Sequence, residues 1–181
     1  MAKPSKTKDP TDSGTQKTRA EPIPWDKNPA WLERILEFLG NAESFRNKLF
    51  SKSNTKAAKE GRTKLAGVVF GCFMPGPEFG EAADQEMEFK TKISVPRELR
   101  DGYAADPKRF GLLLQQQFAK LRTTYRGYMN HLRETGGGIK EGSEYDNLMQ
   151  EFRDEWSLFD TLDGFWHELP NFNPIGVHLW K

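Results

Sequence analysis

The sequence predicts an all-α protein, a helical bundle with one long helix and additional C-terminal helices. Apolar residues recur at intervals of three and four along most of the chain, which is the spacing of one helix face. No stretch alternates apolar and polar residues as a half-buried strand does, and no internal repeat is present. Thirteen Phe and five Trp in 181 residues can supply the core of one domain.

The first 24 residues differ in composition from the helix that follows them. Residues 1–24 contain Lys, Ser, Thr, Asp and Pro with almost nothing apolar, and such a segment cannot bury enough surface to offset its chain entropy. We therefore expect residues 1–24 to be a disordered tail. A helix follows, with Asn28 as N-cap, Pro29 in its first turn and Gly40-Asn41 at its end. Its apolar residues at helical spacing are Trp31, Ile35, Phe38 and Leu39.

Shorter elements fill the region up to residue 91. Residues 42–50 and 55–62 predict two short helices. The stretch 65–76 is ambiguous, because its two adjacent valines favour a strand while its four-residue apolar steps favour a buried helix. We expect a helix, on the spacing of Leu65, Val69 and Phe73. Residues 75–91 are acidic and rich in turn residues, which is typical of a loop or a loose helix.

The strongest pattern in the chain is a helix of nearly thirty residues. Asp106 is its expected cap, Pro107 begins it, and the glycines at 136–138 end it. Its length is roughly twice that of an average globular helix. One or two further helices are expected between residues 144 and 169, with Asp160 as the cap of the last, before an extended, Pro-punctuated end. The apolar stripe of the long helix comprises Phe110, Leu114, Phe118, Leu121, Tyr125, Tyr128 and Leu132.

The formal net charge of +1 hides an uneven distribution of charge along the chain. Between residues 46 and 64 there are seven bases and a single acid, Glu60. Residues 97–133 contain eight bases and three acids, whereas residues 134–168 contain ten acids and two bases. Two basic stretches are therefore followed by an acidic, aromatic C-terminal part.

Several classes of protein are excluded or disfavoured. The single cysteine, Cys72, allows no internal disulfide, and no apolar run approaches the ~18 residues of a membrane span. The N-terminus lacks the apolar stretch of a signal peptide, so we expect a soluble, intracellular protein with no membrane contact. The three histidines are too widely spaced in the sequence to indicate a metal site. The glycines at 136–138 do not indicate a phosphate-binding loop, because they end a helix whereas such a loop precedes one. We predict no enzyme activity, no metal and no small-molecule cofactor.

The long helix carries a basic and amide-rich flank. At about 100° per residue, Lys108, Gln115, Arg122, Arg126 and Arg133 fall beside the apolar stripe. Ala119, Thr123 and Asn130 face away from the core. Arginine and Gln/Asn side chains pair with guanine and adenine edges in a major groove, while lysine mostly meets phosphate. The alternative is an ordinary solvated helix face, or a face that the acidic C-terminal part covers within the same molecule.

The stretch "LLLQQQFAKLRTTYRGYMNHLRETGGGI" resembles the third helix of Myb/SANT-like (trihelix-type) DNA-binding domains. Trp31 with Ile35 and Leu39 is similar to the tryptophan-led first helix of that family, and "FRNKLF" and "DGFWHELPNFNPIGV" resemble segments of uncharacterised fungal proteins with this layout. Two features depart from the family pattern: no Trp lies between Trp31 and Trp156, and the acidic segment 75–91 lengthens the connection before the long helix.

The resemblance implies a Myb/SANT-like bundle at 25–141 whose long third helix enters a DNA major groove, followed by a helical extension at 142–181 that packs on the same domain. It implies sequence-directed binding of double-stranded DNA through helix 107–134, in a nuclear protein of transcriptional or transposon origin. The alternative is a protein-interaction module of the same fold, which holds a protein partner through its acidic, aromatic C-terminal part. The candidate DNA-binding residues are Lys52, Lys56, Lys59, Arg62, Lys64, Gln115, Arg122, Thr123, Arg126, Asn130 and Arg133.

Overall fold

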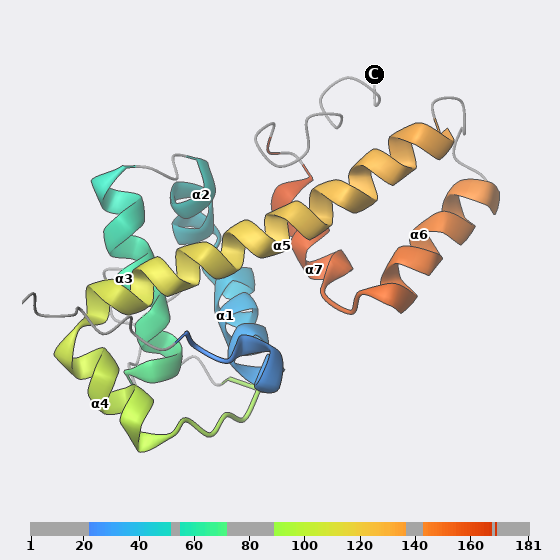
Figure 1. The fold of residues 1–181 in the computed structure, drawn as a ribbon. Coiled ribbons are helices and arrows are strands. Elements are labelled where there is room, and N and C mark those ends of the chain that lie inside the picture. Colours follow the sequence, from blue (N-terminus) through green and yellow to red (C-terminus); the bar gives the residue numbers. More distant parts are fainter. Residues whose placement is uncertain (1–21, 52–54, 72–88, 137–142, 168, 170–181) are drawn as a thin grey trace, which may run out of the picture.

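The structure is a computed structural model that describes residues 22–51, 55–71, 89–136, 143–167 and 169. Every regular element in these ranges is helical, so the all-α prediction is confirmed (Figure 1). The longest helix crosses the molecule, with the earlier helices at its first half and the last two beside its second half (Figure 1). The elements are a 3-10 turn at Trp25–Lys27, α1 (Pro29–Asn41), α2 (Glu43–Ser51), α3 (Lys56–Phe70), α4 (Arg97–Ala105), α5 (Pro107–Gly136), α6 (Ser143–Glu155) and α7 (Phe159–Trp166).

The predicted helix caps have different outcomes. The backbone N–H of Arg109 donates to Asp106 Oδ1 at 3.1 Å, which confirms Asp106 as the cap of α5. Asn28 does precede α1, but its side chain makes no cap bond and its Nδ2 donates instead to the Pro24 carbonyl at 3.2 Å. The prediction for Asp160 is wrong, because α7 begins one residue earlier and Asp160 lies in its first turn. There it accepts a hydrogen bond from Arg153 Nε at 2.8 Å and joins α7 to α6.

Two helices differ from the sequence-based expectation. α3 is a single helix that spans the predicted 55–62 segment and the first part of the ambiguous stretch, up to Phe70. It is continuous because its second half is buried on nearly all sides, from Leu65 to Phe70. α4 was not predicted, since none of its side chains is fully buried and its apolar stripe is short. Within the described residues the long helix is consequently the fifth α-helix and not the third. Residues 72–88, with most of the acidic segment, lie outside these residues.

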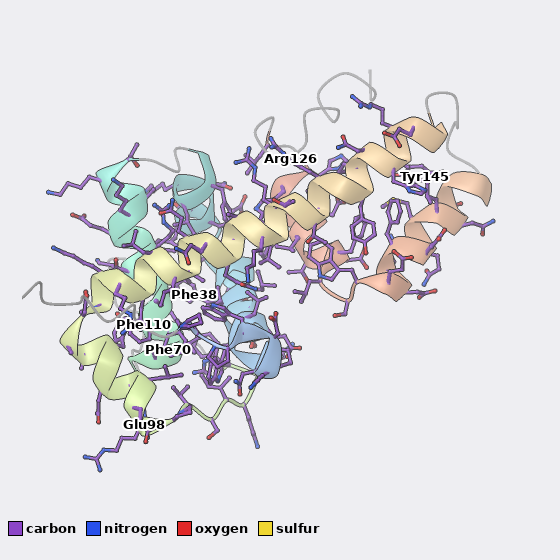
Figure 2. All side chains as sticks on the ribbon, viewed as in Figure 1. Phe38, Phe70, Glu98, Phe110, Arg126 and Tyr145 are labelled. Carbon is purple, nitrogen blue, oxygen red and sulfur yellow. The ribbon has the colours of Figure 1, made fainter. Side chains whose placement is uncertain are left out.

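The first half of the core is aromatic and joins α1, α3 and α5. Phe70 packs against Trp31 with ring centroids 5.5 Å apart and against Phe110 at 5.0 Å. Figure 2 shows Phe38, Phe70 and Phe110 in the space between these helices. Ile23 is also buried, so the folded part begins slightly before the expected boundary at residue 24; residues 1–21 lie outside the description.

The second half of the core joins α5 to α6, α7 and α2. Trp166 is fully buried, and its ring packs against Tyr125 at 5.5 Å and against Phe50 at 5.7 Å. The Tyr125 hydroxyl donates to Asp163 Oδ1 at 2.6 Å, and burial raises the pKa of this tyrosine further than that bond does. Because α7 contacts α2 as well as α5, the C-terminal helices share the core of the helices before them. Most of the predicted apolar stripe of α5 is buried: Phe110, Leu114, Phe118, Leu121 and Tyr125.

An extended segment after residue 88 is held against α1 by Glu37. Its Oε1 accepts from the Lys90 N–H at 2.7 Å and its Oε2 from the Thr91 N–H at 3.1 Å, while Arg34 donates to the Thr91 carbonyl at 3.0 Å. Burial alone would raise the pKa of Glu37. The two backbone hydrogen bonds, aided by the charge of Arg34, outweigh burial and hold the pKa below its ordinary value of 4.5.

We expect Glu37→Gln to remove a pH-dependent part of the stability. Because folding lowers this pKa, the carboxylate contributes stability that is present above pH 4.5 and is lost as the pH falls through the folded-state pKa. The difference in unfolding free energy between the wild type and the variant should therefore be constant near neutrality and shrink in acid. Urea denaturation at a series of pH values measures it. Glu33→Gln, at an exposed position of the same helix, is the control. A difference that stays constant into acid would contradict this role.

Candidate nucleic-acid interface

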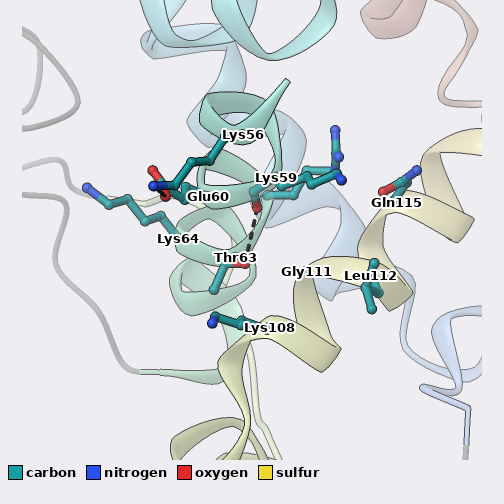
Figure 3. Close-up of a pocket in the computed structure, with 10 residues that line it drawn as sticks. Lys56, Lys59, Glu60, Thr63, Lys64, Lys108, Gly111, Leu112 and Gln115 are labelled. Atoms are coloured by element: carbon teal, nitrogen blue, oxygen red, sulfur yellow. Dashed lines mark hydrogen bonds and ion pairs between the residues drawn. The ribbon is translucent and has the colours of Figure 1, made fainter. Parts of the chain in front are cut away.

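The lysines of α3 and the first turns of α5 line one groove with a volume of about 520 Å³ (Figure 3). Two stretches that are far apart in the sequence meet there because α3 packs directly on α5. Four of the candidate residues that precede α5 contribute to it, together with Gln115 from α5. The complete lining comprises Lys56, Lys59, Glu60, Arg62, Thr63, Lys64, Lys108, Gly111, Leu112 and Gln115.

The floor of the groove is a close contact between Thr63 and Gly111. A Cβ at Gly111 would lie 2.6 Å from Thr63 Oγ1 and 3.0 Å from its Cα and backbone N. Only glycine lets the two helices approach this closely. The Thr63 hydroxyl donates to the Lys59 carbonyl at 3.1 Å, within its own helix (Figure 3). Lys59 extends from α3 on the side of the groove that Gln115 lines (Figure 3).

The α3 candidates are not equivalent. Lys56, Lys59 and Lys64 are exposed and can reach a ligand outside the protein. Lys56 lies 3.8 Å from Glu60, but both side chains are mostly exposed, so the pair holds the lysine weakly. Arg62 differs: its side chain is only 4% exposed, and burial lowers its pKa. It forms part of the groove wall and does not project from the surface. Lys52 lies outside the described residues.

The remaining candidates lie along α5. Residues 107–133 contain six bases and no acid. Thr123, Asn130 and Arg133 are exposed, and the Thr123 hydroxyl donates to the Ala119 carbonyl at 3.0 Å. Arg122 and Arg126 are half-buried one turn apart, and burial, then the charge of Arg126, lowers the pKa of Arg122. The six bases are Lys108, Arg109, Lys120, Arg122, Arg126 and Arg133.

The C-terminal helices do not cover the exposed side of α5. They pack on its apolar side, where Tyr128 meets Phe152 at 4.8 Å and Phe159 at 5.7 Å. Two of their acids are engaged locally: Asp160 with Arg153, and Asp163 with Tyr125 and His167. The outward positions Thr123, Asn130 and Arg133 are accessible with α6 and α7 in place.

Four residues of the groove were not singled out from the sequence as site residues: Glu60, Thr63, Gly111 and Leu112. Leu112 is 57% exposed, and Gly111 forms the helix contact. A glycine in the middle of a helical pattern is the signal for a close approach, but the partner of that approach cannot be read from the pattern. Lys108 was placed on the basic flank, seven residues before Gln115, and it lines the same groove.

Other kinds of site were also sought. Among the described residues there is no group of three or more His, Cys, Asp or Glu side chains that could hold a metal ion. Within those same ranges, no helix combines the length and the apolar character needed to cross a membrane. Comparisons with protein-family models, with curated proteins and with solved structures gave no match. The resemblance to Myb/SANT-like domains stays a prediction.

Proposed function

We propose that the protein binds double-stranded DNA in a sequence-directed manner, without chemistry, through the exposed face of α5 and the lysines of α3 beside it. The observation that carries this proposal is a helix with six bases and no acid over residues 107–133, whose outward side the C-terminal helices leave accessible. Since the overall charge is only +1, this distribution concentrates positive potential on one part of the surface.

The contacts divide into two kinds. Lys56, Lys59 and Lys64 would meet phosphates and set the orientation of the domain on the duplex. Arg126, Asn130 and Arg133 would face base edges, since arginine pairs with guanine and asparagine with adenine in the major groove. The helix can approach DNA closely because residues 119, 123 and 127 on its outward side are Ala, Thr and Gly. With DNA as the partner, the nucleus is the compartment in which we expect the protein.

A protein partner is the second candidate, and a different surface favours it. Tyr128 and Trp156 are half-buried and stacked, with ring centroids 5.7 Å apart and planes at 14°. Glu155 adjoins this pair, and its charge contributes to the raised pKa of Tyr128, after the effect of burial. Aromatic faces attract cations and a carboxylate carries the opposite charge, so this surface suits a basic peptide.

The test is fluorescence anisotropy of a mixed-sequence duplex titrated with protein across a salt series. We expect binding that weakens with salt, and a slope of log affinity against log salt that becomes shallower by about 0.9 for each phosphate-binding side chain that a variant removes. Arg126→Ala/Arg133→Ala should weaken binding at least about tenfold, because each charge-assisted contact contributes roughly 1.5–3 kcal/mol. Lys27→Ala/Lys92→Ala removes the same charge from exposed positions elsewhere and should change affinity less than about twofold.

Base reading is tested by selecting preferred sites from random duplexes. Asn130→Ala should relax the preference at one base position by about 1–3 kcal/mol and leave the others unchanged. The proposal fails if folded protein shows no salt-dependent binding, or if the control pair weakens binding as much as the arginine pair does. A search for a protein partner of the Tyr128–Trp156 surface would then come first.

A further inference from the structure

The groove between α3 and α5 contains the α3 lysines that would meet DNA phosphates, but it is a separate feature from the outward face of α5. It is bounded by two helices and has the volume of a pocket for one small molecule, which typically ranges from ~300 to 1,000 Å³. A duplex backbone runs across a surface and does not need such a recess. We propose that this groove binds a phosphate monoester attached to an apolar or aromatic group of nucleotide size. This proposal does not rest on the DNA-binding function.

The charge of the lining points to an anion with more than one negative charge. Five of the lining side chains are cationic and only one, Glu60, is acidic. Glu60 Oε1 lies 3.8 Å from Lys56 Nζ, at the exposed end of α3. The other two lysines near the floor, Lys59 and Lys108, lie on either side of the Thr63–Gly111 contact (Figure 3). A phosphate monoester carries about −1.5 to −2 charges at neutral pH and three acceptor oxygens. Its charge and its three acceptor oxygens suit a lining that holds several lysines.

A buried cation strengthens the case for a built site. Arg62 lines the groove although only 4% of it is exposed, and burial lowers its pKa. Its guanidinium therefore adds a positive charge to the wall of the groove, where the attraction to an anion is screened less by water than at an exposed position. Arg62 lies next in the sequence to Thr63, whose close contact with Gly111 forms the floor of the groove.

The rest of the lining suits the remainder of such a ligand. Leu112 is 57% exposed. Among the described residues, no other large hydrophobic side chain is exposed. It offers an apolar contact for a base or another flat ring. Gln115 lines the groove one helical turn further along, and its amide can donate and accept at the edge of that ring. The groove therefore has cationic side chains for a dianionic group and an apolar side chain, Leu112, for the rest of the ligand.

Isothermal titration calorimetry of the full chain tests this with adenosine 5′-monophosphate as the probe. We expect saturable binding of the monophosphate, no binding of adenosine, and weaker binding of the methyl ester, whose phosphate has one charge less. Lys59→Ala/Lys108→Ala should reduce affinity at least about tenfold through loss of two charge-assisted hydrogen bonds. Lys48→Ala/Lys92→Ala removes two exposed lysines that lie outside the groove and outside α5, and should change affinity less than about twofold.

The same chemical group also occurs at the 5′ end of a nucleic-acid strand. A short duplex with 5′-phosphates and its 5′-hydroxyl counterpart distinguish that source from a free nucleotide. A preference for the phosphorylated duplex that disappears in Lys59→Ala/Lys108→Ala supports the groove as an end-binding site, even if internal DNA binding fails. The proposal is overturned if neither the monophosphate nor the phosphorylated end is preferred. It is also overturned if both lysine pairs reduce affinity equally, since binding would then follow overall charge alone.

Discussion

Replacing Trp166 with alanine is expected to lower the free energy of unfolding by about 3–5 kcal/mol, the range for large aromatic residues in a packed core. Trp166, the last residue of α7, has no exposed surface and packs against α2 and α5. Truncation would remove its packing against the rings of Phe50 and Tyr125 and leave a cavity where these helices meet. Urea denaturation followed by circular dichroism and by tryptophan fluorescence measures the decrease.

The matched control is Trp156→Ala. Trp156 is half-buried and stacked on Tyr128 at the edge of the same region, so its removal should cost less than that of Trp166. The two probes should give one common transition in the wild type, because α7 shares its core with helices from the first half of the chain. Two separate transitions would show that α6 and α7 form an independently folding extension, and equal costs for both variants would contradict the greater role given to Trp166.

Local signals in the sequence predicted the start and the buried side of α5. Asp106 and Pro107 identify the start of α5. The Asp106 carboxylate accepts a hydrogen bond from a backbone N–H of the first turn, and Pro107 has no N–H that would be left without a partner there. The three- and four-residue spacing of apolar side chains identifies the buried side of α5, because residues three and four apart lie on the same face of a helix. α4 was not predicted from the sequence, because its apolar stripe is short. The stripe consists mainly of Leu99 and Tyr103, and both are only partly buried.

The candidate site was harder to predict, because it depends on which helices meet. Lys56, Lys59 and Gln115 were singled out for separate reasons, and nothing in the sequence indicates that they share one groove. That depends on the contact between Thr63 and Gly111. Arg62 shows the same limit: a long side chain on a basic helix can be solvated or can lie along apolar surface, and the packing of α3 on α5 decides between them.

Alanine substitutions at two glycines of α5 should have effects of opposite sign. Alanine is the better helix former by about 0.8–1 kcal/mol in a helix interior. At Gly127 an added Cβ meets nothing within 4 Å, so Gly127→Ala should stabilise the protein by about that amount. At Gly111 the Cβ would lie 3.0 Å or less from three atoms of Thr63, two of them in the backbone. Overpacking of about 1–3 kcal/mol outweighs the helix gain there, so Gly111→Ala should destabilise.

The same pair separates folding from binding. Thermal denaturation gives the two stability changes, and both variants are then titrated with the duplex and with adenosine 5′-monophosphate. Gly111→Ala should weaken binding of the monophosphate, because it forces α3 and α5 apart at the floor of the groove. Gly127→Ala should leave binding of the monophosphate unchanged and weaken binding of the duplex, since the methyl group lies on the side of α5 that would approach DNA. A stabilised Gly127→Ala protein that binds the duplex as well as the wild type does would show that this side of the helix makes no close contact with DNA.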